Sequence, residues 1–148
     1  MATVNPYLTF NGNCEEVFNF YRSVFGGEFT YVGRYKDMPP ENPVPDSEKE
    51  KIMHISLPIS GETVLMGGDS SEAFGCVAKF GDNIALSVNT ESQLEASRIF
   101  NELSLGGKVI MPLEKTFWGA FFGMFTDKFG VNWMVSYDFK SDENPMTN

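Results

Sequence analysis

The sequence predicts an α+β fold in which two βαβββ modules form a curled mixed sheet with the helices on its outer face. The first observation is that strand-like runs surround two amphipathic helical runs, one in each half of the chain. The second is that each helical run ends in a glycine pair, at Gly26-Gly27 and at Gly106-Gly107. The third is a set of corresponding positions at the same spacing: Leu8 and Val88, Phe20 and Phe100, Phe25 and Leu105, Phe29 and Val109. This duplication predicts one domain, residues 1–148, with internal modules at 4–69 and 82–139 and a trough on the face away from the helices.

The first module is expected to begin with a strand over 7–10, followed by a turn that ends at Asn13. Asn13 is a good helix N-cap, and apolar residues then recur at three-to-four spacing as far as Phe25, which predicts a helix with one buried stripe. We expect further strands over 28–35, 51–59 and 62–67. The intervening stretch 37–50 is predicted to be a loop because it contains four prolines: Pro39, Pro40, Pro43 and Pro45.

The second module is expected to repeat this order, with a first strand over 83–89. Thr90 is the expected cap of a helix over 91–105, and the buried face of that helix is predicted to carry Leu94, Ile99, Phe100 and Leu103. Strands are then expected over 108–113, 120–126 and 131–139. In the last of these, Trp133, Val135 and Tyr137 alternate with Asn132, Met134 and Ser136. We expect Trp133, together with Phe129 just before the strand, in the core.

Charge and composition exclude some classes of function. The formal net charge is −9, so the field around the protein repels nucleic-acid backbones and anionic membrane surfaces. The N-terminus has no charged-then-apolar leader, and no apolar run approaches about 18 residues, so we expect a cytoplasmic protein. The two cysteines, Cys14 and Cys76, are too few for a disulfide framework. Cys14 lies where the first helix begins, a position that can lower the pKa of a thiol, but we expect it to be a small, inert filler.

Two stretches of the chain resemble a known family. The first comprises the run 6–16 and the run Phe25-Gly26-Gly27-Glu28, and the second comprises Thr116-Phe117-Trp118-Gly119 and Asp127-Lys128-Phe129-Gly130. Both resemble the PhnB-like branch of the vicinal oxygen chelate superfamily, which includes glyoxalases, bleomycin-resistance proteins and extradiol dioxygenases. The resemblance spans residues 5–139 and implies the βαβββ-repeat fold and a homodimer.

Enzymes of this superfamily hold a divalent metal ion with His and Glu side chains from four strands. The resemblance places those positions at Asn5 or Pro6, Met66, Asn83 and Met134. None of these residues is a histidine or a carboxylate, so we expect no metal ion in the usual place and no cofactor. Branch members are also described as demethylubiquinone methyltransferases. We do not expect that activity, because no glycine-rich loop followed by an acidic ribose-binding residue is present to hold a nucleotide-like cofactor.

His54 is the only histidine. Alternation along its strand predicts that Ile52, His54 and Ser56 share one face while Met53, Ile55 and Leu57 lie in the core. His54 is therefore expected at the trough or its rim. There it is a candidate proton shuttle or hydrogen-bond partner for a substrate, or a histidine held by hydrogen bonds without a chemical role.

The remaining candidates are side chains expected to line the trough and to bind a ligand. They are Tyr7, Tyr35, Met66, Asn83, Phe117, Trp118, Phe122 and Met134. Aromatic rings in a trough stack on flat or apolar molecules, although about half of such residues usually fill the core instead. We therefore predict a protein that binds a small, partly apolar molecule without the usual metal. The alternative is an enzyme of the lyase, isomerase or dioxygenase type that uses His54 or a shifted metal site.

Overall fold

The computed structural model describes residues 1–39, 41, 43–74 and 77–140. It divides into two compact units, Met1–Lys79 (unit 1) and Phe80–Asn148 (unit 2). Within the described residues, no helix is long and apolar enough to cross a membrane.

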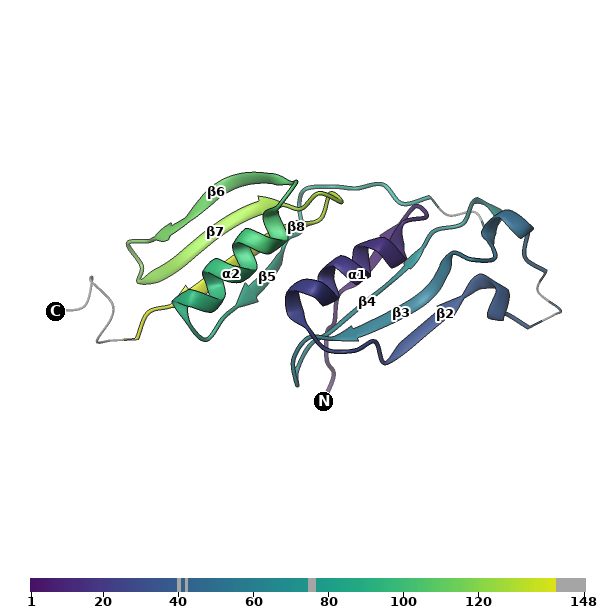
Figure 1. Cartoon of the computed structure of the whole chain (residues 1–148), viewed down its shortest axis with the longest axis horizontal. Helices are drawn as coiled ribbons and strands as arrows, with labels where there is room; N and C mark the ends of the chain where they lie inside the picture. Colours follow the sequence, from purple (N-terminus) through teal and green to yellow (C-terminus); the bar gives the residue numbers. More distant parts are fainter. Residues whose placement is uncertain (40, 42, 75–76, 141–148) are drawn as a thin grey trace. The chain divides into compact units, whose positions relative to one another are not determined.

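Unit 1 is a four-stranded mixed sheet with one helix against one face (Figure 1). The strand order is β1-β4-β3-β2, in which β1 runs parallel to β4 and the other neighbours are antiparallel. The elements are β1 (Tyr7–Phe10), α1 (Cys14–Phe25), β2 (Tyr31–Arg34), β3 (Ile52–Pro58) and β4 (Val64–Asp69), with short 3-10 segments η1 (Tyr35–Asp37), η2 (Asp46–Glu48) and η3 (Glu72–Phe74).

Unit 2 repeats the same order and the same directions. Its strand order is β5-β8-β7-β6, and α2 covers one face of that sheet (Figure 1). The elements are β5 (Leu86–Asn89), α2 (Gln93–Ser104), β6 (Lys108–Lys115), β7 (Ala120–Thr126) and β8 (Asn132–Asp138). The predicted α+β class and the repeated βαβββ order are therefore confirmed.

In each unit the core lies between the helix and the sheet. Burial of this apolar surface is the main favourable term in the folding of each unit. In unit 1 the fully buried side chains include Val17, Phe18, Tyr21, Ile55, Leu57 and Leu65. In unit 2 the buried side chains include Ile99, Phe100, Leu103, Phe125, Trp133 and Val135. The predicted core position of Trp133 is confirmed, whereas Leu94 is 82% exposed and does not belong to the buried face of α2.

Several predicted boundaries were wrong at the starts of elements. The first strand after α1 begins at Tyr31 rather than at 28, and the first strand of unit 2 begins at Leu86 rather than at 83. Helix α2 begins after Ser92, whose hydroxyl accepts a hydrogen bond from the Glu95 amide at 3.0 Å. Ser92, and not Thr90, is therefore the N-cap.

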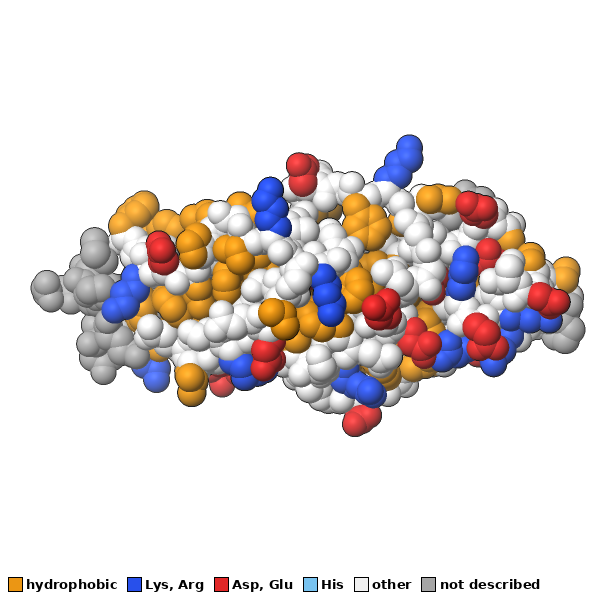
Figure 2. All heavy atoms as spheres, turned by 45° about the horizontal axis from the view of Figure 1, so that its top comes forward, with side chains coloured by type: hydrophobic (Ala, Val, Ile, Leu, Met, Phe, Trp, Pro, Cys, Tyr) orange, Lys and Arg blue, Asp and Glu red, His pale blue; other side chains and the backbone are white. Residues whose placement is uncertain are grey.

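Exposed hydrophobic side chains gather on unit 2 (Figure 2). Strand β6 lies at the edge of its sheet and is exposed along almost its whole length. The exposed large side chains on β6 and in the turn that follows are Val109, Ile110, Met111, Phe117 and Trp118.

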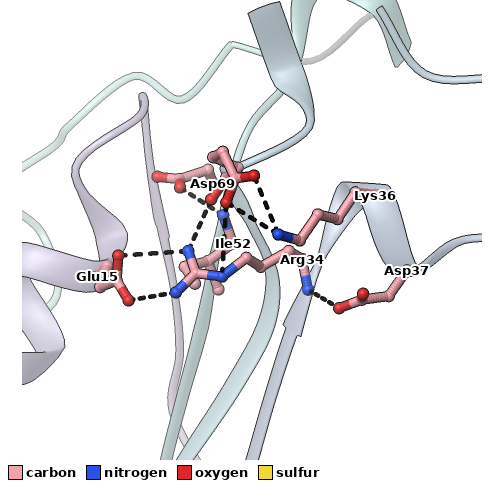
Figure 3. A network of polar contacts seen from close by, with 7 residues as sticks. Glu15, Arg34, Lys36, Asp37, Ile52 and Asp69 are labelled. Carbon is pink, nitrogen blue, oxygen red and sulfur yellow. Dashed lines mark hydrogen bonds and ion pairs between the residues drawn. The ribbon is translucent and has the colours of Figure 1, made fainter. Parts of the chain in front are cut away.

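The carboxylate of Asp69 joins three parts of unit 1, and Figure 3 shows its contact with Ile52. One carboxylate oxygen accepts hydrogen bonds from the Gly12 and Cys14 amides, and the other accepts one from the Ile52 amide, each at 2.9 Å. Asn13 occupies the N-cap position but makes no side-chain capping hydrogen bond. A carboxylate from β4, distant in sequence, therefore satisfies the first amide of α1 and an amide of the turn before it, which local sequence patterns do not predict.

Arg34 links the proline-containing loop, residues 37–50, to α1 by hydrogen bonds (Figure 3). Its guanidinium donates to both carboxylate oxygens of Glu15 and, at 2.8 Å, to the backbone carbonyl of Glu50. The hydrogen bond from Arg34 holds the pKa of the Glu15 carboxyl below its usual value.

Candidate functional site

The open face of the unit 1 sheet, away from α1, carries one continuous row of side chains. In the register of the strands, Tyr7 pairs with Met66, Met66 with Ser56, and Ser56 with Tyr31. Side chains of paired residues lie on the same face of a sheet, so this row crosses all four strands. Tyr7 and Tyr31, at its two ends, are each about half exposed.

His54 lies between the two tyrosine rings. Its ring centroid is 5.6 Å from that of Tyr7, with the rings nearly stacked at 28°, and 5.6 Å from that of Tyr31, with an angle of 51°. These separations fall within the range of favourable aromatic contacts. The three rings therefore form one cluster, which we call the ring cluster.

Two glycines leave room for the tyrosines. A Cβ atom on Gly33 would lie 2.6 Å from the Tyr31 hydroxyl oxygen and 2.8 Å from a carbon of its ring. A Cβ atom on Gly68 would lie 2.8 Å from the Tyr7 hydroxyl oxygen. Both distances are shorter than real side chains tolerate, so the tyrosines can fold down onto the sheet only over glycine.

The ring cluster also presents polar groups. Nε2 of His54 lies 3.0 Å from the hydroxyl oxygen of Ser56, and the Tyr7 hydroxyl donates a long hydrogen bond of 3.4 Å to the Met53 carbonyl. Burial raises the pKa of the Tyr7 phenol above its usual value, with a smaller contribution from Cys14. The cluster thus combines flat apolar surface with donors and acceptors, the usual composition of a small-molecule site.

The predicted alternation along β3 is wrong at its first residues. The pairing of β2 with β3 shifts between Gly33 and Arg34, so that Gly33 pairs with His54 but Arg34 pairs with Ile52. This bulge places Ile52 in the core, where it is fully buried, while Met53 is only partly buried. His54 and Ser56 nevertheless lie on the open face, as their alternation predicted.

Three of the predicted site residues come together in unit 2. The Phe117 and Trp118 ring centroids are 5.0 Å apart, and those of Trp118 and Phe122 are 6.0 Å apart. Trp118 is 57% exposed in the turn between β6 and β7, and Phe117 is 78% exposed. Met134 lies on the open face of the same sheet, where it pairs with Met124 and with Ser87.

Two other predicted site residues lie apart from these clusters. Tyr35 belongs to η1, and its hydroxyl donates to the Asp69 carbonyl at 2.7 Å, which ties the loop to the end of β4. Asn83 is exposed and lies outside β5. In contrast, the sequence interpretation missed Tyr31 as a site residue. The available signal was Gly33 two positions later, on the same face of the strand.

Two further groups, Asp127 and Cys14, are buried. Asp127 accepts hydrogen bonds from the Phe129 and Val131 amides and from the indole Nε1 of Trp133. Cys14 is fully buried, and burial together with the Asp69 charge raises the pKa of its thiol.

In the described ranges, which omit residues 40, 42, 75–76 and 141–148, no group of three or more His, Cys, Asp or Glu side chains is placed to hold a metal ion.

The chain is similar to known proteins over nearly its whole length. The family model described as 3-demethylubiquinone-9 3-methyltransferase matches residues 2–136. Protein YjdN of Escherichia coli (strain K12) is 31% identical over 144 residues, which cover 90% of this chain and 93% of that protein.

The chain is also similar to solved structures over nearly its whole length. The crystal structure of protein PA1353 from Pseudomonas aeruginosa is 42% identical, with a TM-score of 0.82 and coverage of 93% of this chain and 98% of that one. A putative 3-demethylubiquinone-9 3-methyltransferase, PhnB protein, from Bacillus cereus is 27% identical, with a TM-score of 0.73 and coverage of 92% and 99%. A glyoxylase/bleomycin resistance protein/dioxygenase domain from Frankia sp. EAN1pec is 12% identical, with a TM-score of 0.66 and coverage of 94% and 98%, and shows the shared fold.

Proposed function

This chain belongs to the 3-demethylubiquinone-9 3-methyltransferase family, the PhnB-like branch of the glyoxalase/bleomycin resistance/dioxygenase superfamily, and we propose that it binds a small, partly apolar molecule on the open face of unit 1. The observation that carries this proposal is the ring cluster of Tyr7, His54 and Tyr31. The proposal includes no divalent metal ion at the positions that the superfamily uses and no cofactor.

The chemistry of the ring cluster determines the kind of ligand. Tyr7 and Tyr31 expose about half of their surface, so a flat molecule that covers them removes apolar area from water. His54 and Ser56 lie within the same row and offer hydrogen bonds to a polar group on that molecule. The ligand therefore has a planar apolar part and at least one hydrogen-bonding group.

The test adds indole to the full chain as a probe and follows its binding by two-dimensional NMR. We expect indole to shift the signals of Tyr7, Tyr31 and His54, and the Tyr31→Ala variant to lose these shifts. The matched control is Val32→Ala, which removes the neighbouring side chain of β2 on the opposite face. Equal binding by the two variants, or shifts that avoid the ring cluster, would contradict the proposal.

A second candidate function is acid–base catalysis by His54. It is favoured by the 3.0 Å contact between Nε2 of His54 and the hydroxyl of Ser56, which orients the imidazole on an accessible face. Under this candidate, the His54→Gln variant still binds a compound that the unchanged protein converts. Mass spectrometry of the products should then show that the variant no longer converts it. The methyltransferase activity in the family's description is not proposed, because the sequence lacks a glycine-rich cofactor loop.

Two further parts of the proposal concern metal and assembly. We expect no stoichiometric divalent ion in protein purified without chelator or nickel resin, by elemental analysis. One ion per chain that is lost in His54→Ala would instead favour the enzyme. We also propose a homodimer, as the family resemblance implies, and light scattering coupled to size exclusion measures its mass.

A further inference from the structure

Unit 2 carries three methionines side by side on the open face of its sheet. Met111 of β6 pairs with Met124 of β7, and Met124 pairs with Met134 of β8. Side chains of paired residues lie on the same face, with Cβ atoms about 4.5–5.5 Å apart. We call Met111, Met124 and Met134 the methionine row.

The methionine row is accessible to solutes. Met111 is 45% exposed, and Met124 and Met134 are partly buried. Their sequence neighbours Phe125, Trp133 and Val135 are buried on the opposite, helix-covered face. The row therefore does not belong to the core beneath α2. The register of β6 shifts on both sides of Met111, which interrupts the edge ladder at that residue.

Three adjacent thioethers form a distinctive set of ligands. Thioether sulfur is a soft donor that favours Cu(I) over hard or borderline cations. It carries no proton, so protons do not compete with a cation for it. Each methionine has three rotatable bonds, so the sulfur atoms of neighbouring side chains can turn toward a common ion. The net charge of −9 also raises the local concentration of cations around the protein.

We propose that the methionine row binds one soft monovalent cation of the Cu(I) class through thioether sulfur. This inference is independent of the proposed function, which depends on unit 1 alone. Of the positions that the resemblance assigns to the superfamily's divalent metal site, only Met134 belongs to the row, and the proposed ligands are thioethers in place of histidine and carboxylate side chains.

Unit 1 supplies the matched control. Met66 occupies the position in its sheet that Met134 occupies in unit 2, since each lies on the last strand opposite the strand that begins the unit. The neighbours of Met66 are Tyr7 and Ser56, so no second thioether adjoins it in the row. A lone thioether binds a soft cation weakly, whereas three adjacent thioethers bind it together.

The test labels the methionine methyl groups with carbon-13 and titrates the full chain with Ag(I), a redox-stable probe for Cu(I). We expect the methyl signals of Met111, Met124 and Met134 to shift together at one equivalent, while that of Met66 stays unchanged. Any binding of Ag(I) to cysteine would leave these methyl signals in place. The same shifts should follow Cu(I) added with ascorbate under anaerobic conditions.

Variants decide whether the row acts as one site. Met124→Leu removes the central thioether and should abolish the joint shift of Met111 and Met134, whereas Met66→Leu should leave it intact. Met111→Leu, at an exposed position, provides a second variant if Met124→Leu is poorly folded. The proposal is wrong if the unit 2 methionines do not shift, if Met66 shifts equally, or if the remaining row methionines still bind normally in both variants.

Discussion

The same row of the sheet carries different chemistry in the two units. In unit 1 the row reads Tyr7, Met66, Ser56 and Tyr31, and in unit 2 it reads Ser87, Met134, Met124 and Met111. The backbone order and strand directions are the same, so the fold fixes the positions but not the function. We propose that the rings and hydroxyls at these positions bind a flat molecule and that the thioethers bind a soft cation.

Glycine accounts for part of this difference. Gly68 in unit 1 pairs with Thr9, and at the equivalent place in unit 2 Ser136 pairs with Asn89. A side chain at Gly68 would collide with the Tyr7 hydroxyl and with the Met53 carbonyl, at 2.8 and 2.7 Å. Unit 1 can therefore accommodate a large ring folded down on its sheet at this place, where unit 2 carries a side chain.

The largest expected effect is the loss of stability when a buried tryptophan of unit 2 is replaced, compared with the replacement of an exposed one. Trp133→Ala should cost about 3–5 kcal/mol of stability, because the indole is buried and donates to Asp127. Trp118→Ala should change stability by less than about 1 kcal/mol, because Trp118 is exposed. Chemical denaturation measures both variants, and a similar loss in both would place Trp118 in the core.

The next effect concerns the buried carboxylate of unit 1. Asp69→Asn should cost about 3 kcal/mol, because three backbone amides lose part of a charged acceptor. Asp138→Asn, at an exposed position, is the control. Denaturant midpoints that are equal for the two variants would show that the Asp69 hydrogen bonds contribute little.

A smaller change in stability but a clear change in binding is expected for Gly33→Ala. The added methyl group displaces only the Tyr31 ring, which is the far end of a side chain, so stability should change by less than about 1 kcal/mol. Indole binding should fall as far as in Tyr31→Ala. Gly61→Ala, where a Cβ atom meets nothing within 4 Å, should bind normally.

The smallest effect is on pH dependence. Arg34 lowers the pKa of Glu15 in the folded protein, so the ion pair contributes stability above the usual Glu value of 4.5. That contribution disappears as the pH falls through the lowered pKa. Because Glu15 is about half exposed, it amounts to less than about 1 kcal/mol. Glu15→Gln should flatten this acid limb of the stability curve, and an unchanged limb would rule out the ion pair as its cause.

The sequence predicted the architecture well because the duplication and the hydrophobic periodicity are properties of the whole chain. It predicted the ends of elements less well. The start of α1 depends on Asp69, which lies on a distant strand, and the face of Ile52 depends on a bulge in the pairing with β2. Neither interaction is local in sequence.

Prediction of the candidate site was limited for the same reason. His54 and Tyr7 were predicted site residues, and they are in contact. Tyr31 was missed in favour of Tyr35, because both tyrosines lay in one predicted strand and only the true register distinguishes them. Similarly, Met134 was considered alone, since its adjacency to Met124 and Met111 emerges only from the pairing of three strands.

His54 provides the most direct test of the ring cluster, because it is the only histidine and its ring protons give signals of their own. The measurement is an intermolecular nuclear Overhauser effect between bound indole and the His54 ring, with the full chain in excess of the probe. We expect cross-peaks to His54 and to both flanking tyrosines. Indole that binds with cross-peaks only to other residues would contradict the assignment of the site to unit 1.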